Sequence, residues 1–236
     1  MEQPPSRIVP AVPVGARLLF GEQLGAIEAY AQVLADTGVD HGLIGPREVP
    51  RLWDRHLLNC GVVSELVPAN SSVADVGSGA GLPGLVLAIA RPDLRVTLIE
   101  PLQRRVTWLE STVEDLQLDN VVVRRDRADQ ATDIQVDVVT SRAVAALPKL
   151  ANWCMPLLRD QGTMLALKGS SAETELADAA QMLERSGAIS CDVVQCGGQI
   201  IDPAATVIRI RVGDRARKTA RVRRASRKPP GGSRNG

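Results

Sequence analysis

The stretch Ala74-Asp75-Val76-Gly77-Ser78-Gly79-Ala80-Gly81-Leu82-Pro83-Gly84 decides the fold of this chain. Its four glycines close an expected buried strand, residues 73–76, and open an expected helix near residues 82–91. Glycine has no Cβ and tolerates positive φ, so such a loop lets backbone come close to a ligand. The helix after it presents unpaired N–H groups, and Pro83 suits its first turn. The stretch predicts a ligand-binding strand–loop–helix unit; the alternative is a tight turn without a ligand.

Two carboxylates near this loop bear on the identity of the ligand. Gly79, Gly81 and Gly84 satisfy the G-x-G-x-x-G pattern of dinucleotide sites. A carboxylate at the mouth of the loop, Asp75, would repel a pyrophosphate but suits the ammonium and sulfonium charges of S-adenosylmethionine. Glu100, at the end of the next expected strand, can accept hydrogen bonds from the ribose hydroxyls of either ligand. We therefore expect S-adenosylmethionine, with an NAD-dependent oxidoreductase as the alternative.

The chain from residue 72 onward alternates between strand and helix patterns. Strands are expected at residues 73–76, 95–99, 121–123, 136–140 and 162–167, and helices at 82–91, 102–118, 147–158 and 172–186. This alternation is typical of an α/β, doubly wound, Rossmann-like parallel sheet. Two further strands, residues 191–196 and 206–212, are expected to add a C-terminal antiparallel hairpin.

Two amphipathic helices, residues 18–36 and 47–67, precede the sheet and are expected to form an N-terminal helical cap. The sequence thus divides into four parts: a flexible arm, the cap, a methyltransferase-like domain and a basic tail, at residues 1–17, 18–70, 71–213 and 214–236.

The charge of the chain is unevenly distributed along its 236 residues, although the net charge is only +1. Residues 215–236 hold nine Lys and Arg and no acid, so the remaining 214 residues carry 19 basic and 27 acidic groups. We interpret the basic segment as a disordered arm that binds nucleic-acid phosphates, the alternative being a solubilising tail.

Composition excludes several other classes of protein. Four cysteines without a zinc spacing and two histidines predict no metal site. Five aromatic residues are too few for a platform that stacks several RNA bases. Without a secretory signal or a long apolar run, a cytoplasmic protein with no membrane contact is expected, acting as a monomer.

The carboxyl ends of the expected strands place further candidates at the ligand-binding edge of the sheet. Ala128-Asp129, after the third strand, stands where adenine would be held, with Asp129 accepting from its amino group. Arg142 and Lys168 follow the fourth and fifth strands. They are expected to clamp an RNA phosphate or the target base; the alternative is an ion pair with an acid at the same edge.

The residues after the fourth strand bear on the chemistry. Thr140-Ser141-Arg142-Ala143 stands where methyltransferases of exocyclic amines carry an Asn-Pro-Pro-Tyr-like segment. Cys154 lies on an expected helix and is interpreted as a core residue, not as a thiolate nucleophile. Guanine N7 already has a free lone pair, so its methylation needs only in-line placement. The pattern is consistent with chemistry at N7.

Several segments together resemble a known family. They are Asp75–Gly84, Arg91-Pro92, Arg105-Val106, Asp126-Arg127-Ala128, Ser141-Arg142-Ala143 and Ala166-Leu167-Lys168-Gly169. In this order and spacing they look like the bacterial 16S ribosomal RNA guanine-N7 methyltransferases, the glucose-inhibited division protein B family, over about residues 20–212. The family's usual His-x-x-Asp-Ser segment is present here as His56-Leu57-Leu58-Asn59-Cys60. His56 is interpreted as a structural histidine of the cap.

The resemblance implies an enzyme that methylates one guanine N7 in the decoding-region hairpin of 16S rRNA, with the rRNA or the small ribosomal subunit as partner. The implied cofactor contacts are Gly77, Leu82, Ala128, Asp129 and Arg142, and the implied RNA or catalytic contacts are Arg127, Arg142 and Lys168. Together with Asp75, Gly79, Gly81 and Glu100 from the loop analysis, these are the candidate site residues. A non-catalytic RNA-binding assembly factor remains an alternative.

Overall fold

The computed structural model describes residues 7–131, 133–142 and 144–214, and within them a seven-stranded sheet has the order β3-β2-β1-β4-β5-β7-β6. The strands are β1 (Ser72–Val76), β2 (Arg95–Ile99), β3 (Val121–Arg124), β4 (Val136–Arg142), β5 (Leu158–Lys168), β6 (Ala188–Cys196) and β7 (Ala205–Val212). β1 to β5 pair in parallel, whereas β7 runs antiparallel to both β5 and β6. The predicted doubly wound sheet with a C-terminal antiparallel hairpin is confirmed.

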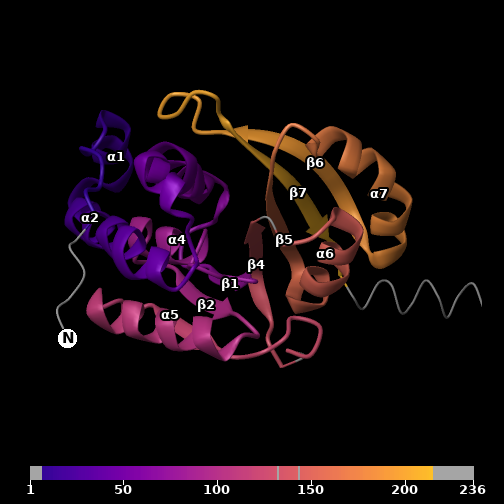
Figure 1. Ribbon diagram of the computed structural model, residues 1–236. Coiled ribbons are helices and arrows are strands. Elements are labelled where there is room, and N and C mark those ends of the chain that lie inside the picture. The colour runs from indigo at the N-terminus through magenta and orange to yellow at the C-terminus, as the bar shows by residue number, and fades with distance from the viewer. Residues whose placement is uncertain (1–6, 132, 143, 215–236) are drawn as a thin grey trace, which may run out of the picture.

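Helices cover both faces of this sheet (Figure 1). They are α4 (Gly84–Ala90) and α5 (Gln103–Asp115) on one face, and α6 (Leu147–Cys154), its 3-10 extension η6 (Met155–Leu157) and α7 (Ala172–Ser186) on the other. Successive strand side chains point to opposite faces. In β1, Val73 accordingly belongs to the hydrophobic cluster under α4, and Ala74 to the cluster under α6.

The N-terminal helices form the predicted cap, and they share one hydrophobic cluster with α4, α5 and the sheet. The first stretch comprises α1 (Val14–Phe20), η1 (Gly21–Gln23), α2 (Leu24–Val33) and η2 (Leu34–Gly38). The second comprises η3 (Pro46–Arg51), η4 (Leu52–Leu58), α3 (Asn59–Gly61) and η5 (Val62–Leu66), mostly 3-10 and π turns. Pro50 lies inside η3, where proline cannot donate a helical hydrogen bond.

The two ends of the chain were expected to be loose, and the described part of the N-terminal arm is not. The Trp53 indole N–H donates to the Pro10 carbonyl at 2.9 Å, and Arg7 pairs with Asp40 at 2.8 Å. Helix α1 begins at Val14, within the expected arm. The basic segment, residues 215–236, lies outside the described residues. Among the described residues, no helix is long and apolar enough to cross a membrane.

Asp75 joins strand β1, an interior strand of the sheet, to helix α4. It shares a face of β1 with Val73 and is fully buried, and its Oδ2 accepts a hydrogen bond from the Gly84 N–H at 3.1 Å. A Cβ on Gly84 would lie 2.4 Å from Leu98 Cδ2 and 2.7 Å from that same Asp75 oxygen. Only glycine therefore allows the helix to begin this close to the carboxylate. Burial raises the pKa of Asp75 from 3.8 to about 7.

The raised pKa makes Asp75 a source of pH-dependent stability. Between about pH 4 and pH 7 the folded chain holds a proton on Asp75 that the unfolded chain has lost, so the unfolding free energy falls as pH rises. Asp75→Asn keeps an acceptor for Gly84 but removes the titration. In urea unfolding across pH 4 to 8, the stability of Asp75→Asn relative to the parent should rise up to about pH 7 and then level off.

Asp137 supplies a control of opposite sign. Burial raises its pKa, but hydrogen bonds from Ser72 outweigh this effect and leave the pKa below its ordinary value. The stability that Asp137 contributes is present above its unfolded pKa and lost as pH falls through its folded value, so Asp137→Asn should flatten the acid side of the curve. If the unfolding free energies of Asp75→Asn and the parent differed by the same amount at every pH, Asp75 would not titrate with a raised pKa in the folded protein.

Candidate functional site

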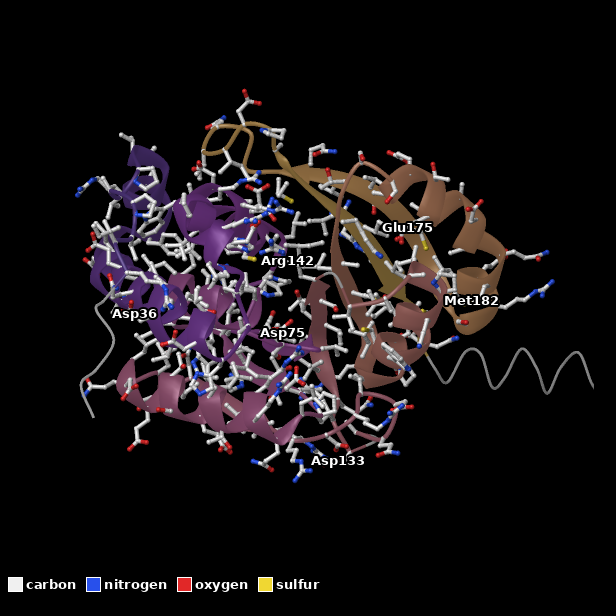
Figure 2. The ribbon with its side chains drawn as sticks, in the orientation of Figure 1. Asp36, Asp75, Asp133, Arg142, Glu175 and Met182 are labelled. Atoms are coloured by element: carbon white, nitrogen blue, oxygen red, sulfur yellow. The ribbon has the colours of Figure 1, made fainter. Side chains whose placement is uncertain are left out.

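A cavity of about 720 Å³ opens at the carboxyl edge of the parallel strands. Its wall combines the glycine loop, the ends of β2 and β4, the segment after β3, helix α6 and the cap. Figure 2 shows Arg142 of β4 beside the N-terminal helices, above Asp75 of β1. The cavity lies where open α/β sheets bind their ligands.

Most of the candidate residues named from the sequence line this cavity. They are Gly77, Gly79, Leu82, Glu100, Arg127, Ala128, Asp129 and Arg142. Among the described residues that line the cavity, three candidates are missing: Asp75, Gly81 and Lys168.

The glycines of the loop have different tasks. Gly77, Gly79 and Gly81 all have positive φ, at 72°, 56° and 84°. A Cβ on Gly81 would lie 2.4 Å from Leu85 Cδ1, so Gly81 permits packing inside the protein. A Cβ on Gly79 would meet no atom nearer than 3.8 Å, which is an ordinary van der Waals distance. Gly79 is therefore the glycine that leaves room for a ligand.

Glu100 lies in the cavity wall with its carboxylate fixed by backbone donors. The residue is 1% exposed; Oε2 accepts from the Gly79 N–H and Oε1 from the Leu102 N–H, each at 3.0 Å. Arg105 Nη1 lies 3.6 Å from Oε2. A carboxylate has about four lone-pair positions, so these contacts leave acceptor capacity for ligand hydroxyls.

Asp75 corrects one expectation. Its carboxylate does not stand at the mouth of the loop, because alternation along β1 turns it under α4 and away from the cavity. Its role in this structure is to hold the start of α4. Tyr30, from cap helix α2, supports the same loop by donating its hydroxyl to the Ala80 carbonyl. Asp75 thus acts on the glycine loop from beneath it.

Arg127 and Asp129 form an exposed ion pair at the cavity edge. Arg127 Nε lies 3.1 Å from Asp129 Oδ1, and the hydrogen bond from Arg127 holds the pKa of Asp129 below its ordinary value. An exposed pair of this kind contributes little to stability, so it opens readily. Both side chains are therefore available to ligands at little cost.

Arg142 and Lys168 were expected to act together, and the sheet separates them. In the β4–β5 register Arg142 is opposite Leu167, so Lys168 is one residue further along and faces the other side of the sheet. Its Nζ pairs with Glu175 of α7 at 2.7 Å and donates to the Ala145 carbonyl at 3.0 Å. Figure 2 places Glu175 on the side of α7, away from Arg142. The ion-pair alternative thus describes Lys168, whereas Arg142 faces the cavity and the cap.

Cys154 was expected to be a core residue, and the structure agrees. Cys154 is fully buried in α6, and burial raises the pKa of its thiol well above the ordinary value. It packs in the core beneath α6, so its thiol is not positioned as a nucleophile.

Sequence reasoning missed several residues around the cavity. Trp153 and Lys149 line it from α6, and the Lys149 ammonium lies 5.0 Å from the Trp153 ring centroid. Their spacing of four on an expected helix could have revealed this pair. His56 was interpreted as structural; it is buried and bonded to Glu48, yet it also lines the cavity. Nothing in the sequence pattern links Glu48 to His56.

The residues of this cavity fit S-adenosylmethionine. Gly79 leaves a space that a Cβ would fill, and the Glu100 and Asp129 carboxylates can accept from ribose hydroxyls and an adenine amine. Arg105 Nε, at the same wall, is buried without a hydrogen-bond partner among the described residues. Such a donor is costly unless a ligand satisfies it.

Comparison with solved structures supports the fold. A SAM-dependent O-methyltransferase from Thermotoga maritima matches with a TM-score of 0.52 at 16% identity, covering 66% of this chain and 65% of that one. A ribosomal protein L11 methylase from Lactobacillus delbrueckii subsp. bulgaricus also gives 0.52, at 15% identity, covering 67% and 79%. At these identities the likeness concerns the Rossmann-like methyltransferase fold alone.

Comparison of sequences identifies the family. The family model of rRNA small subunit methyltransferase G matches residues 23–202. Proteins named ribosomal RNA small subunit methyltransferase G are 56% identical in Thermobifida fusca, over 92% of each chain, and 53% identical in Streptomyces avermitilis, over 87% of each chain. The resemblance seen in the sequence motifs is confirmed, and the chain belongs to the rRNA small subunit methyltransferase G family of S-adenosylmethionine-dependent enzymes.

Proposed function

We propose that this protein transfers a methyl group from S-adenosylmethionine to the N7 of one guanine in the decoding-region hairpin of 16S rRNA. The observation that carries this proposal is the composition of one cavity: the open face of Gly79, the fixed acceptor Glu100 and the cation Arg142 line it together. Family membership supports the same substrate class.

Each residue has a task that follows from its chemistry. Glu100 accepts the ribose hydroxyls, and Asp129 accepts from the adenine amino group once its pair with Arg127 opens. When bound, S-adenosylmethionine supplies a methyl group activated by the positive charge on sulfur. Arg142 orients the target nucleotide, and Arg127 contacts an RNA phosphate at the cavity edge.

Methylation of guanine N7 suits these residues. The N7 lone pair is free at neutral pH, so neither a general base nor a covalent intermediate is required, and rate comes from in-line placement. Held by three acceptors of the cap, Arg142 is fixed well enough to provide such placement.

We propose 16S rRNA, alone or within the small ribosomal subunit, as the partner of a monomer acting in the cytoplasm. In this proposal the basic residues 215–236 increase the rate of encounter with RNA without selecting its sequence. Neither an NAD-dependent oxidoreductase nor a non-catalytic assembly factor is favoured by the family match.

Mass spectrometry of 16S rRNA tests the activity directly. Cells that contain the protein should carry a methylated guanine in the decoding-region hairpin that cells lacking it do not. An unmodified guanine in both strains would overturn the proposed function. Calorimetry with S-adenosylmethionine, and with NAD as the control ligand, checks the cofactor independently.

Substitution at Gly79 should abolish S-adenosylmethionine binding without unfolding the protein. Gly79→Val places a branched side chain in the open face of the loop. Gly21→Val is the control for valine at a positive φ, because Gly21 has a φ of 49° and no atom within 4 Å of its Cβ position but lies in the cap. Glu100→Ala should weaken binding by roughly 1–3 kcal/mol through lost hydrogen bonds. Equal affinities of Gly79→Val and Gly21→Val for S-adenosylmethionine by calorimetry would show that Gly79 does not contact the ligand.

Lys168 should support methylation indirectly, by holding the Ala145 carbonyl next to the cavity residue Val144. Lys168→Ala and Glu175→Gln should then lower the methylation rate by similar factors and leave S-adenosylmethionine affinity unchanged. Arg159→Ala, which breaks the pair with Asp137 elsewhere in the sheet, is the control and should have no effect on the rate. Abolished methylation in Lys168→Ala beside a normal rate in Glu175→Gln would mean that Lys168 touches the substrate.

A further inference from the structure

Arg142 reaches from the end of β4 into the cap and is held there by three acceptors of the segment 55–60. Its Nη2 donates to the Arg55 carbonyl at 3.0 Å and lies 3.1 Å from His56 Nδ1, while Nη1 donates to Cys60 Sγ at 3.2 Å. A guanidinium has five N–H donors, so these contacts do not exhaust it. Arg142 is thus anchored by the cap while it lines the cavity.

The contact with Arg142 identifies the tautomer of His56. A guanidinium can only donate, so His56 Nδ1 must be the acceptor and carries no hydrogen. The neutral ring therefore bears its proton on Nε2, which lies 2.8 Å from Glu48 Oε2. Glu48 is a fitting acceptor, because the hydrogen bond with His56 holds the pKa of its carboxyl below the ordinary value.

The charged groups around His56 favour this neutral form. Burial, the Arg142 guanidinium and the Arg55 side chain lower the pKa of His56, while Glu48 opposes them, and the net shift is downward. A protonated imidazole would point an Nδ1–H at a permanent cation. At neutral pH Arg142 therefore donates to His56, and His56 donates to Glu48.

We propose that Glu48 and His56 are positioning residues for Arg142: Glu48 fixes the Nε2–H tautomer of His56, and the free Nδ1 holds the guanidinium at the cavity. Without Glu48, the imidazole is free to take the other tautomer or to rotate, and Arg142 loses an acceptor. This inference rests on the proposed function, in which Arg142 orients the target nucleotide.

Two substitutions of His56 separate its two hydrogen bonds. The side-chain oxygen of His56→Asn falls near the Nδ1 position and keeps an acceptor for Arg142. His56→Gln places its amide near the Nε2 position, keeping the Glu48 contact but losing the acceptor. With small ribosomal subunits from cells lacking the protein as substrate, His56→Asn should turn over about tenfold or more faster than His56→Gln, in kcat more than in KM. Equal kcat values in two folded variants would overturn the positioning role.

The tautomer has a readout that needs no methylation. The chain has two histidines, so the variant His41→Asn assigns the signals in long-range ¹H–¹⁵N NMR spectra. His56 should be the Nε2–H tautomer in the parent, and this preference should weaken in Glu48→Ala. An Nδ1–H tautomer in the parent, or an unchanged spectrum in Glu48→Ala, would overturn the inference.

The two experiments also distinguish this inference from the proposed function. If the parent protein fails to methylate the ribosomal subunit, the proposed function is wrong and the positioning role fails with it, while the NMR spectra still decide whether the hydrogen-bond chain exists. If the parent methylates the subunit and the two His56 variants behave alike, only the inference fails.

Discussion

The glycine loop keeps its shape because three side chains from three elements bind its backbone. Glu100 at the end of β2 accepts from Gly79, Asp75 of β1 accepts from Gly84, and Tyr30 of the cap donates to Ala80. Glycines with positive φ cost conformational entropy and have little intrinsic preference for one shape. The surrounding elements must therefore fix the loop, and the cavity exists only where sheet, helix and cap meet.

The cap is consequently part of the site and not a separate module. It shares a hydrophobic cluster with α4 and one face of the sheet, and it supplies Ile44 and His56 to the cavity wall. Arg142 links the sheet to the cap in turn, because it extends from the end of β4 and donates to the Arg55 carbonyl. A substitution in the cap can therefore change the cavity without touching the glycine loop, through the position of one guanidinium.

Sequence patterns predicted the elements whose boundaries are local. The limits of β2 and α7 agree with the residues expected. The two cap segments lie near the expected residues, but α1 begins at Val14 and residues 46–66 form mostly 3-10 and π turns in place of one regular helix. Strand β5 begins at Leu158, whereas the sequence placed its start at Gly162. The strand continues across Gln161 even though this residue has a positive φ of 63°. The cavity-facing glycines followed from the motif. The direction of Lys168 did not, because it depends on the register of β4 against β5. Asp75 could have been placed better, since alternation from Val73 already turns it toward α4.

The chain Glu48–His56–Arg142 could not be predicted, because it depends on 3-10 and π turns whose spacing follows no helical period. Its last member also explains why one departure from the family pattern matters. Cys60 stands where the resembling family usually has serine, and a thiol is a weaker acceptor than a hydroxyl. The Arg55 carbonyl is a backbone group that no side-chain substitution removes. Of the acceptors that hold Arg142, the His56 ring is therefore the one strong contact that a neighbouring side chain, Glu48, can tune.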